Sequence, residues 1–256
     1  MDTINNESVL VTVITPCYNA ATTIGNSIKS VLAQTYSMWE MIVVDDCSSD
    51  DSADIIKSFS SKDPRIRYFK TDVSSGSPAL PRNIGIDNAS GDVIAFLDAD
   101  DIWLPDKLSE QVRFMNENGC VFVYSDYEKI DAVGNRNNRK IRMPLKSSFW
   151  DVVETCTIPC LTAMLTREII GNTRFKAIPK EDFAFWLEIL KKNVVAYNTG
   201  KLHALYREQP ESRSSNKFAM IRNQWYVLRR IEGVKPPVAT YFMIKFLFNG
   251  FFKYLK

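Results

Sequence analysis

The chain has 256 residues, of which 45% are hydrophobic and 24% are charged, with 32 basic and 30 acidic side chains. This length can bury a substantial core, and the 10 Gly and 11 Pro exclude collagen-like and globally disordered chains. A formal net charge of +2 leaves no electrostatic footprint for nucleic acid, so we expect no nucleic-acid partner.

Apolar runs alternate with amphipathic segments through the first half of the chain. The apolar runs predict strands covered on both faces at 9–15, 41–45, 66–70 and 93–97. The segments between them predict helices at 22–34, 52–60 and 105–118. This order predicts an α/β fold with a doubly wound, mostly parallel sheet, in which ligands bind beyond the carboxyl ends of the strands.

The pattern loosens in the second half of the chain. It predicts a strand over 121–127, a basic loop or hairpin over 134–142, a helix over 183–190, and two strands over 194–198 and 203–206. No internal repeat and no long linker is evident. We therefore expect one domain over residues 1–215, followed by a C-terminal helical extension over 216–256.

The end of the extension is aromatic and has no acidic residue after position 240. On a helix, one face would carry Tyr241, Ile244, Phe248, Phe251 and Leu255, and another would carry Lys245, Asn249, Lys253 and Lys256. The polar interruptions disfavour a helix that spans a membrane. We expect a basic amphipathic helix on an anionic membrane surface. The alternative is a helix packed on its own domain or on a partner subunit, which leaves a homodimer open.

Acidic side chains follow the predicted strand over 93–97. Asp98 and Asp100 are two residues apart, so in extended chain their side chains point the same way. Two close carboxylates need a counter-ion or must share a proton. Mg²⁺ or Mn²⁺ bridging to phosphate oxygens would serve. The alternative is that Asp100 or Asp101 caps the next helix.

Polar side chains also follow the first two predicted strands. Asp45 and Asp46 come directly after the second strand, where an Asp can accept a hydrogen bond from a base or a ribose, although the Ser-rich turn is equally typical of a helix entry. Tyr18 follows the first strand, where an aromatic ring can stack on a base or can simply be buried.

The cysteine and histidine contents limit the disulfides and metal sites that we expect. The five Cys are scattered and the first eight residues are polar, so we expect a reducing cytoplasm and no disulfide scaffold. One histidine excludes a His-rich metal site, so a metal would be held mainly by oxygen ligands or by thiolates.

Five segments, in this order, resemble the family 2 glycosyltransferases of the GT-A fold. They are VTVITPCYNA, IKSVLAQTY, WEMIVVDDCSSDDS, LPRNIGIDNASGDVIAFLDADD and, more loosely, EDFAFWLEI. The resemblance implies inverting transfer of a sugar from a nucleotide-diphosphate donor to a hydroxyl. It also implies a nucleotide-binding half over 1–105 and an acceptor-side half over 106–215.

The resemblance assigns roles to individual residues. Tyr18 would stack on the base and Asp46, or its neighbour Asp45, would bind the base edge. Asp98 would face the ribose and sugar, and Asp100 would bind Mn²⁺ or Mg²⁺ on the diphosphate, with Asp98 as a second metal ligand. The remaining donor-binding residues would be Pro16, Asn19, Arg82, Ala99 and Arg207.

Asp182 is the expected catalytic base, because Glu181-Asp182 matches the acidic pair of the family. A positioned carboxylate can take the proton that the acceptor hydroxyl sheds, and otherwise Asp182 is a first-turn acid favoured by the helix dipole. The chain departs from the family at Gln209, which stands where many relatives have a metal-binding His. His203 is a weaker candidate metal ligand.

We therefore expect a metal-dependent, inverting hexosyltransferase of surface-polysaccharide biosynthesis. The donor would be a UDP-sugar, and the acceptor a glycan or polyprenyl-linked glycan. The expected location is the cytoplasm, at the inner face of the plasma membrane. The alternative is a non-catalytic nucleotide-sugar-binding subunit of a membrane assembly.

Overall fold

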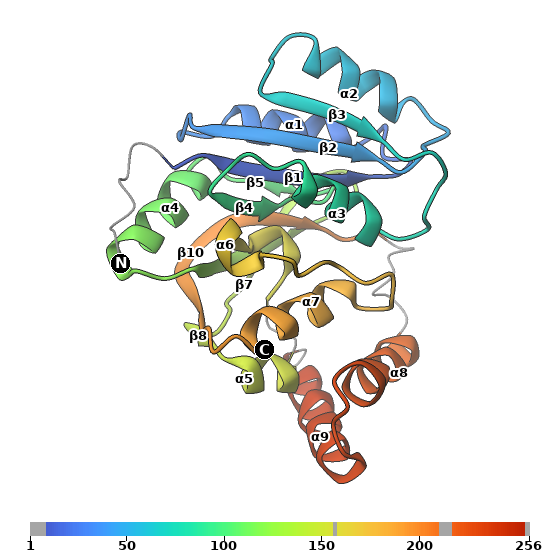
Figure 1. Cartoon of the computed structure of the whole chain (residues 1–256), viewed down its shortest axis with the longest axis vertical. Helices are drawn as coiled ribbons and strands as arrows, with labels where there is room; N and C mark the ends of the chain where they lie inside the picture. The colour runs from blue at the N-terminus through green and yellow to red at the C-terminus, as the bar shows by residue number, and fades with distance from the viewer. Residues whose placement is uncertain (1–8, 156–157, 210–216, 254–256) are drawn as a thin grey trace.

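The computed structural model describes residues 9–155, 158–209 and 217–253. Its centre is one mixed sheet in the order β3-β2-β1-β4-β9-β6-β10-β5, with β7 paired to β6 and β8 to β10 (Figure 1). One end of the sheet is parallel and consists of β1 (Val11–Cys17), β2 (Trp39–Asp45), β3 (Ile66–Lys70) and β4 (Val93–Phe96). This arrangement confirms the predicted α/β, mostly parallel sheet.

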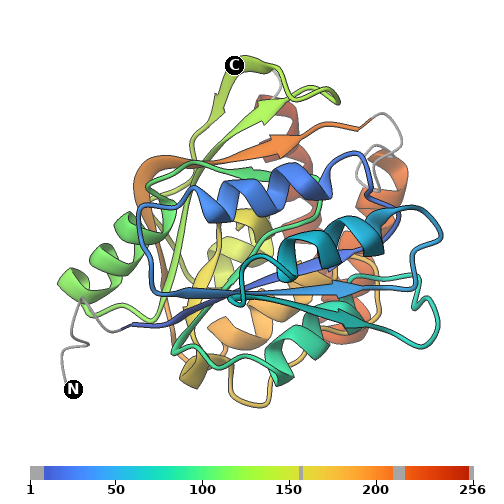
Figure 2. The same ribbon diagram turned by 90° about the horizontal axis from the view of Figure 1, so that it is seen from above.

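Helices cover both faces of the sheet (Figures 1 and 2). The apolar side chains of α1 (Ile24–Leu32), α2 (Ser52–Ser60) and α4 (Lys107–Asn118) share one core with those of one face of the sheet. Those of α3 (Ala79–Asp87), α5 (Phe149–Thr155) and α7 (Glu181–Leu190) share the other core. Because β1 alternates, Val11 and Val13 enter the first core and Ile14 enters the second.

Helix α3 was not predicted from the sequence. Its segment contains Pro81 and Gly85, both weak helix formers in an interior position. Packing explains the glycine: a Cβ at Gly85 would lie 2.4 Å from Cγ2 of Ile14, so α3 can approach β1 only without a side chain there. Tertiary contact therefore overrides local propensity, and it positions Arg82 on this helix.

The second half of the sheet differs from the prediction at its longest strand and in the short strands that were not predicted. The two strands expected over 194–198 and 203–206 form one long strand, β10 (Ala196–Arg207), which pairs in parallel with β6 (Phe122–Ile130) with register shifts between Asn198 and Ala204. The segment predicted as a basic loop or hairpin over 134–142 forms a single strand, β7 (Arg136–Ile141), which pairs with β6 as the second strand of a hairpin. The remaining short elements are β5 (Ile102–Trp103), β8 (Lys146–Ser147), β9 (Met164–Thr166), α6 (Arg167–Ile170) and a 3₁₀ turn at Cys160–Thr162.

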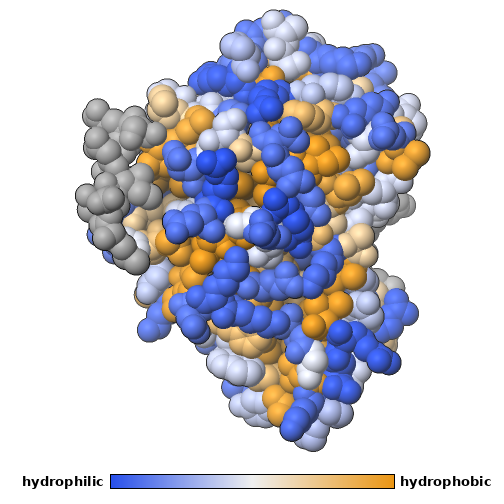
Figure 3. All heavy atoms as spheres, viewed as in Figure 1, coloured by the Kyte–Doolittle hydropathy of each residue, from blue (hydrophilic) through white to orange (hydrophobic). Residues whose placement is uncertain are grey.

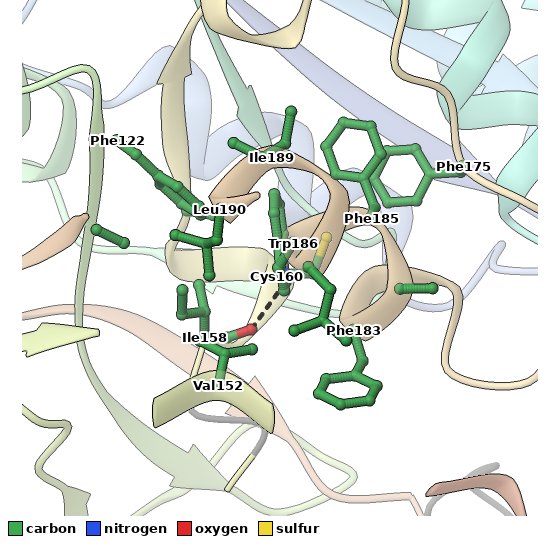
Figure 4. Close-up of a cluster of buried hydrophobic side chains, with 14 of the residues drawn as sticks. Phe122, Val152, Ile158, Cys160, Phe175, Phe183, Phe185, Trp186, Ile189 and Leu190 are labelled. Atoms are coloured by element: carbon green, nitrogen blue, oxygen red, sulfur yellow. Dashed lines mark hydrogen bonds between the residues drawn. The ribbon is translucent and has the colours of Figure 1, made fainter. Parts of the chain in front are cut away.

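An aromatic cluster fixes α7 against the sheet (Figure 4). Phe185 stacks on Phe175 with ring centroids 4.0 Å apart, and Trp186 packs against Phe122 at 5.3 Å. The indole N–H of Trp186 donates to the carbonyl of Ile158 at 3.1 Å, which satisfies its one polar group. These contacts hold the first turn of α7, and with it Asp182, in a fixed position.

The C-terminal segment forms α8 (Lys217–Tyr226), a π-helical turn (Val227–Ile231) and α9 (Pro236–Lys253), at the end of the molecule opposite α2 in Figure 1. Val227, Leu228 and Phe242 belong to the core shared with α7, and Lys245 pairs with Glu154 of α5 at 2.7 Å. Within the described residues, none of the helices combines the length and the apolar character needed to cross a membrane.

Candidate active site

The acidic turn after β4 is held by two other elements. The hydroxyl of Ser27 on α1 donates to the carbonyls of Ala99 and Asp101 at 2.9 and 2.7 Å. The buried carboxylate of Asp101 accepts from the backbone N–H of Arg207 at 2.9 Å. These bonds leave Asp98 and Asp100 half-buried at the surface of the turn, where a ligand can reach them.

Arg82 joins the two acidic clusters that the sequence places 83 residues apart. One guanidinium nitrogen donates to Asp98 Oδ1 at 2.6 Å and the other to Glu181 Oε1 at 3.1 Å. Only 4% of the Arg82 side chain is exposed. Burial alone would lower its pKa, but the carboxylates of Asp98 and Glu181 outweigh burial and hold the pKa well above its ordinary value. Arg82 is therefore a fixed positive charge between the acidic turn and the start of α7.

Asp182 stands in the first turn of α7. Lys180 precedes the helix in a left-handed conformation (φ 58°), and Asp182 Oδ1 accepts from the N–H of Phe183 at 2.7 Å. Burial, and next the charge of Glu181, raise the pKa of Asp182 to about 6, against the lowering effect of Arg82. A carboxylate with this pKa is ionised at neutral pH and is a stronger base than an ordinary Asp.

The carboxylate of Asp100 also has a shifted pKa. Burial, and next the charge of Asp98, raise its pKa to about 6. The side-chain amide of Gln209 donates to Asp100 Oδ2 at 3.1 Å. The oxygen and nitrogen of an amide are interchangeable by a flip, so Gln209 can present either a donor or an oxygen ligand beside Asp100.

Arg207 lies at this turn, but it makes mainly backbone contacts. Its Nε donates to the carbonyl of Asp100 at 2.7 Å and one terminal nitrogen donates to the carbonyl of Ala132 at 3.0 Å. It is 3% exposed. The side chain therefore ties the acidic turn to the β6–β7 hairpin, a positioning role that the sequence did not reveal.

The base-binding candidates lie at the carboxyl ends of β1 and β2. Tyr18 is 56% exposed and directly follows the buried end of β1, which contains Pro16. Asn19 has φ 46°, and its Oδ1 accepts from the N–H of Ser49 at 2.8 Å. Exposure leaves the Tyr18 ring available for stacking, while Asn19 ties the loop after β1 to the loop after β2.

Asp45 and Asp46 already have partners within the chain. Asp45 accepts from the N–H of Ser48 at 2.9 Å and from the hydroxyl of Tyr68 at 3.1 Å. Asp46 accepts from the hydroxyl of Thr71 and from the N–H and hydroxyl of Ser75, at 2.9 to 3.0 Å. The hydroxyl of Ser74 is a further donor at 3.3 Å, so a base could bind Asp46 only where it replaced one of these donors.

One other candidate from the sequence lies apart from this arrangement. His203 is buried and lines a cavity of about 290 Å³ with Asp106, Glu110 and Lys201, a cavity that none of the strand-end carboxylates lines. Burial lowers the pKa of His203 to about 4. Trp103, two residues after Asp101, is buried beside the acidic turn and donates its indole N–H to the carbonyl of Leu161 at 2.8 Å.

The oxygen atoms at the acidic turn suit a hard divalent cation, although the chain supplies few such ligands. Among the described residues, no group of three or more His, Cys, Asp or Glu side chains is arranged to hold a metal. Asp98, Asp100 and the amide of Gln209 offer oxygen ligands, and a cation would neutralise the charge of Asp98 that, after burial, raises the pKa of Asp100. Mg²⁺ and Mn²⁺ characteristically complete such sets with phosphate oxygens and water.

Proteins of known sequence resemble the chain over nearly its whole length. The putative teichuronic acid biosynthesis glycosyltransferase TuaG of Bacillus subtilis is 37% identical over 246 residues, which cover 96% of this chain and 97% of TuaG. The Escherichia coli UDP-Glc:alpha-D-GlcNAc-diphosphoundecaprenol beta-1,3-glucosyltransferase WfgD is 39% identical over 250 residues, 97% of this chain and 96% of WfgD.

Solved structures resemble the chain in fold. S. aureus TarS 1–349 in complex with UDP-GlcNAc superposes with a TM-score of 0.70 at 18% identity, over 93% of this chain and 71% of that one. The mannosyltransferase PcManGT of Pyrobaculum calidifontis, in complex with GDP-Man and Mn²⁺, gives a TM-score of 0.65 at 19% identity, over 92% and 68%. These likenesses confirm the predicted GT-A fold.

The family model named "Glycosyl transferase family 2" matches residues 12–186, from β1 to the middle of α7. The matched range contains the acidic turn, Arg82 and Asp182, so the residues that Arg82 brings together all belong to the shared domain. The chain belongs to glycosyl transferase family 2 and is a glycosyltransferase.

Proposed function

We propose that this enzyme transfers a hexose or an amino sugar from a UDP-sugar to a hydroxyl of a lipid-linked glycan, with inversion at the anomeric carbon. The observation that carries the proposal is the Arg82 bridge, because it joins the acidic turn to the helix start that bears Asp182. The UDP-GlcNAc complex of TarS supports the donor class, and the name of WfgD supports a diphosphoundecaprenol-linked acceptor.

The donor would lie across the carboxyl ends of β1, β2 and β4. Tyr18 would stack on the base, while Asp46 would bind the base edge after exchanging the Ser75 hydroxyl for a base N–H. Asp98 would face the ribose and sugar. Pro16, Asn19, Asp45 and Ala99 would shape this surface, and Arg207 would act through the turn that it holds.

Transfer would proceed by one displacement. The acceptor oxygen forms a bond to the anomeric carbon as the bond from that carbon to the diphosphate oxygen breaks, and its electron pair leaves with the nucleoside diphosphate. The acceptor proton passes to Asp182, which burial and Glu181 have made more basic than an ordinary Asp. No nucleophilic side chain is needed, because a single displacement inverts the centre.

A divalent cation would be held by Asp100, with Asp98 and, after a flip of its amide, the oxygen of Gln209 as further ligands. When bound, such an ion supplies Lewis-acid stabilisation of the negative charge on the departing diphosphate. The Mn²⁺ in the PcManGT complex supports this choice of ion. Asp98 would divide its oxygens between the ion and Arg82.

Turnover by an Asp182→Asn variant tests the proposal. We expect kcat to fall by about 10²–10⁴-fold while the dissociation constant of the UDP-sugar changes by less than about twofold, because Asp182 acts on the acceptor proton. Glu188→Gln is the matched control, since Glu188 lies on the same helix but pairs with Lys176. Full turnover by Asp182→Asn, or NMR evidence that the anomeric configuration is retained, would contradict the proposal. Donor binding without turnover in the wild type would favour the non-catalytic alternative.

The expected surroundings of the enzyme remain predictions. A lipid-linked acceptor would place the chain at the inner face of the plasma membrane, as a peripheral protein in the cytoplasm.

A further inference from the structure

The C-terminal helices differ in charge from the rest of the molecule. Residues 217–253 contain seven Lys or Arg and one acidic residue, Glu232, whereas the remainder has more acidic than basic side chains. Glu232 is buried and pairs with Lys191 outside this segment. The exposed charge of the segment is therefore almost entirely positive, with Arg222, Arg230 and Lys235 on its surface.

Helix α9 is apolar on two faces. Its inner face packs into the core through Ala239, Phe242 and Met243. Its outer face carries a stripe at intervals of three residues, in which the exposed fractions are 42% for Val238, 51% for Tyr241, 53% for Ile244 and 47% for Leu247. Tyr241 and Ile244 belong to the face predicted from the sequence, whereas the side chains of Phe248, Phe251 and Leu255 lie outside the described set. A contiguous exposed apolar surface of this kind marks an interaction site.

Aromatic side chains widen this stripe. Trp150 of α5 is 57% exposed and stacks on Phe242 with ring centroids 5.6 Å apart, and Tyr241 packs against the same ring at 5.5 Å. Trp225 and Tyr226 of α8 are each 39% exposed. In Figure 3, the end of the molecule that contains α8 and α9 carries apolar patches beside strongly hydrophilic side chains. Trp and Tyr beside cations are typical of surfaces that bind at the headgroup level of a bilayer.

We propose that the outer surface of α8 and α9, together with Trp150, which stacks on α9, binds an anionic lipid bilayer, with α9 lying in the plane of the interface. Arg222, Arg230 and Lys235 would bind lipid phosphates, and Trp150, Tyr241, Ile244 and Leu247 would enter the boundary between headgroups and acyl chains. A second copy of this chain is a less favourable partner for this surface than a bilayer, because two such surfaces would bring like charges together. The proposal goes beyond the transfer reaction and does not depend on which acceptor is used.

Co-sedimentation of the full chain with lipid vesicles tests the proposal. Vesicles of phosphatidylcholine with about one third phosphatidylglycerol are compared with vesicles of phosphatidylcholine alone. Removing three cations (Arg222→Gln, Arg230→Gln, Lys235→Gln) should weaken binding to the anionic vesicles by about 100-fold, since each cation near such a surface contributes about 1 kcal/mol. Replacing the stripe residues (Ile244→Asn, Leu247→Asn) should weaken binding by about 10-fold or more.

Matched controls separate this surface from general charge and exposure. Arg139→Gln, Lys140→Gln and Arg142→Gln remove three exposed cations from β7 and its end, and Leu145→Asn replaces a side chain that is 73% exposed elsewhere. These variants should bind vesicles as the wild type does. Equal binding of the wild type to neutral and anionic vesicles, or equal loss in the β7 triple variant, would overturn the proposal. So would a dimer in light scattering that Ile244→Asn dissociates, because a second copy would then occupy the surface.

A second readout separates this proposal from the proposed function. All of these variants should turn over a soluble acceptor analogue at the wild-type rate, because none of the changed residues lies at the acidic turn or at the start of α7. Loss of vesicle binding with full turnover supports the membrane surface alone. Absence of turnover in the wild type with intact vesicle binding would overturn only the proposed reaction.

Discussion

The candidate active site and the C-terminal surface depart in opposite ways from the usual pattern, in which charged side chains are exposed and apolar side chains are buried. The site encloses charge: Arg82, Glu181 and Asp101 are nearly inaccessible to water, and Asp182 and Asp100 are raised in pKa by their burial. The C-terminal surface does the reverse, because it leaves Tyr241, Ile244 and Leu247 half exposed while their neighbours on α9 are buried. Each departure costs free energy in the isolated chain, so each indicates a ligand that would recover it.

The two regions also differ in how their geometry is fixed. In the site, Arg82, Glu181 and Asp101 each have a partner from a different element, and α3, the acidic turn and α7 are linked through one guanidinium. Such a network permits one arrangement and positions its groups precisely. On the outer face of α9, the stripe needs only apolar side chains on one side of the helix. Burial of apolar surface in a lipid interface is not directional, so it requires no precise geometry. We therefore expect sharp effects of substitution in the site and graded effects on the surface.

The largest effect is expected from Arg82→Met, which removes the enclosed positive charge. Glu181 and Asp98 would lose their shared partner, and breaking a buried ion pair costs about 3–5 kcal/mol of unfolding free energy. Because Asp98 remains partly exposed to water, we expect the lower part of this range, together with loss of turnover. Urea denaturation and a donor-turnover assay measure the two effects.

Arg82→Lys is the matched control for charge. A lysine keeps the positive charge but cannot serve both carboxylates as the guanidinium fork does, so we expect stability and turnover between those of the wild type and Arg82→Met. Wild-type stability and turnover in Arg82→Met would show that the bridge has no part in assembling the site.

A smaller effect is expected from pH. Since Asp182 must be ionised to take a proton, kcat should fall as pH falls through about 6, by about tenfold per pH unit below that midpoint. An initial-rate profile at saturating donor and Mn²⁺ measures the midpoint. Glu188→Gln should leave the midpoint unchanged. A midpoint near 4, the ordinary value for Asp, would show that the environment of Asp182 does not make it more basic.

Much of the fold was predictable because short stretches of the sequence determine its strands and helices. The strands β1, β2 and β4 are buried, mainly apolar runs, and α4 ends at Gly119 in the left-handed conformation. Helix α3 escaped prediction because its sequence is a poor helix former that packing stabilises. The two strands expected around residue 200 are one, because the irregular stretch between Asn198 and Ala204 interrupts its periodicity without ending its pairing.

The site was predictable in its residue types but not in its connections. Strand-end carboxylates and the first-turn acid of α7 were visible in the sequence, as was the departure at Gln209. No local pattern could show that Arg82 pairs with Glu181, which lies 99 positions later in the chain. Nor could one show that the hydroxyl of Ser75 donates a hydrogen bond to Asp46. Those contacts depend on how loops from distant parts of the chain meet at one edge of the sheet.

The central claim is that the acidic turn and the start of α7 form one site around a nucleotide sugar. A crystal structure of the chain with UDP and Mn²⁺, with the metal located by anomalous scattering, tests it most directly. We expect the anomalous peak beside Asp100, with UDP between Tyr18 and the acidic turn and with Asp182 facing the diphosphate across open space. A peak elsewhere, or UDP bound away from these residues, would contradict the account.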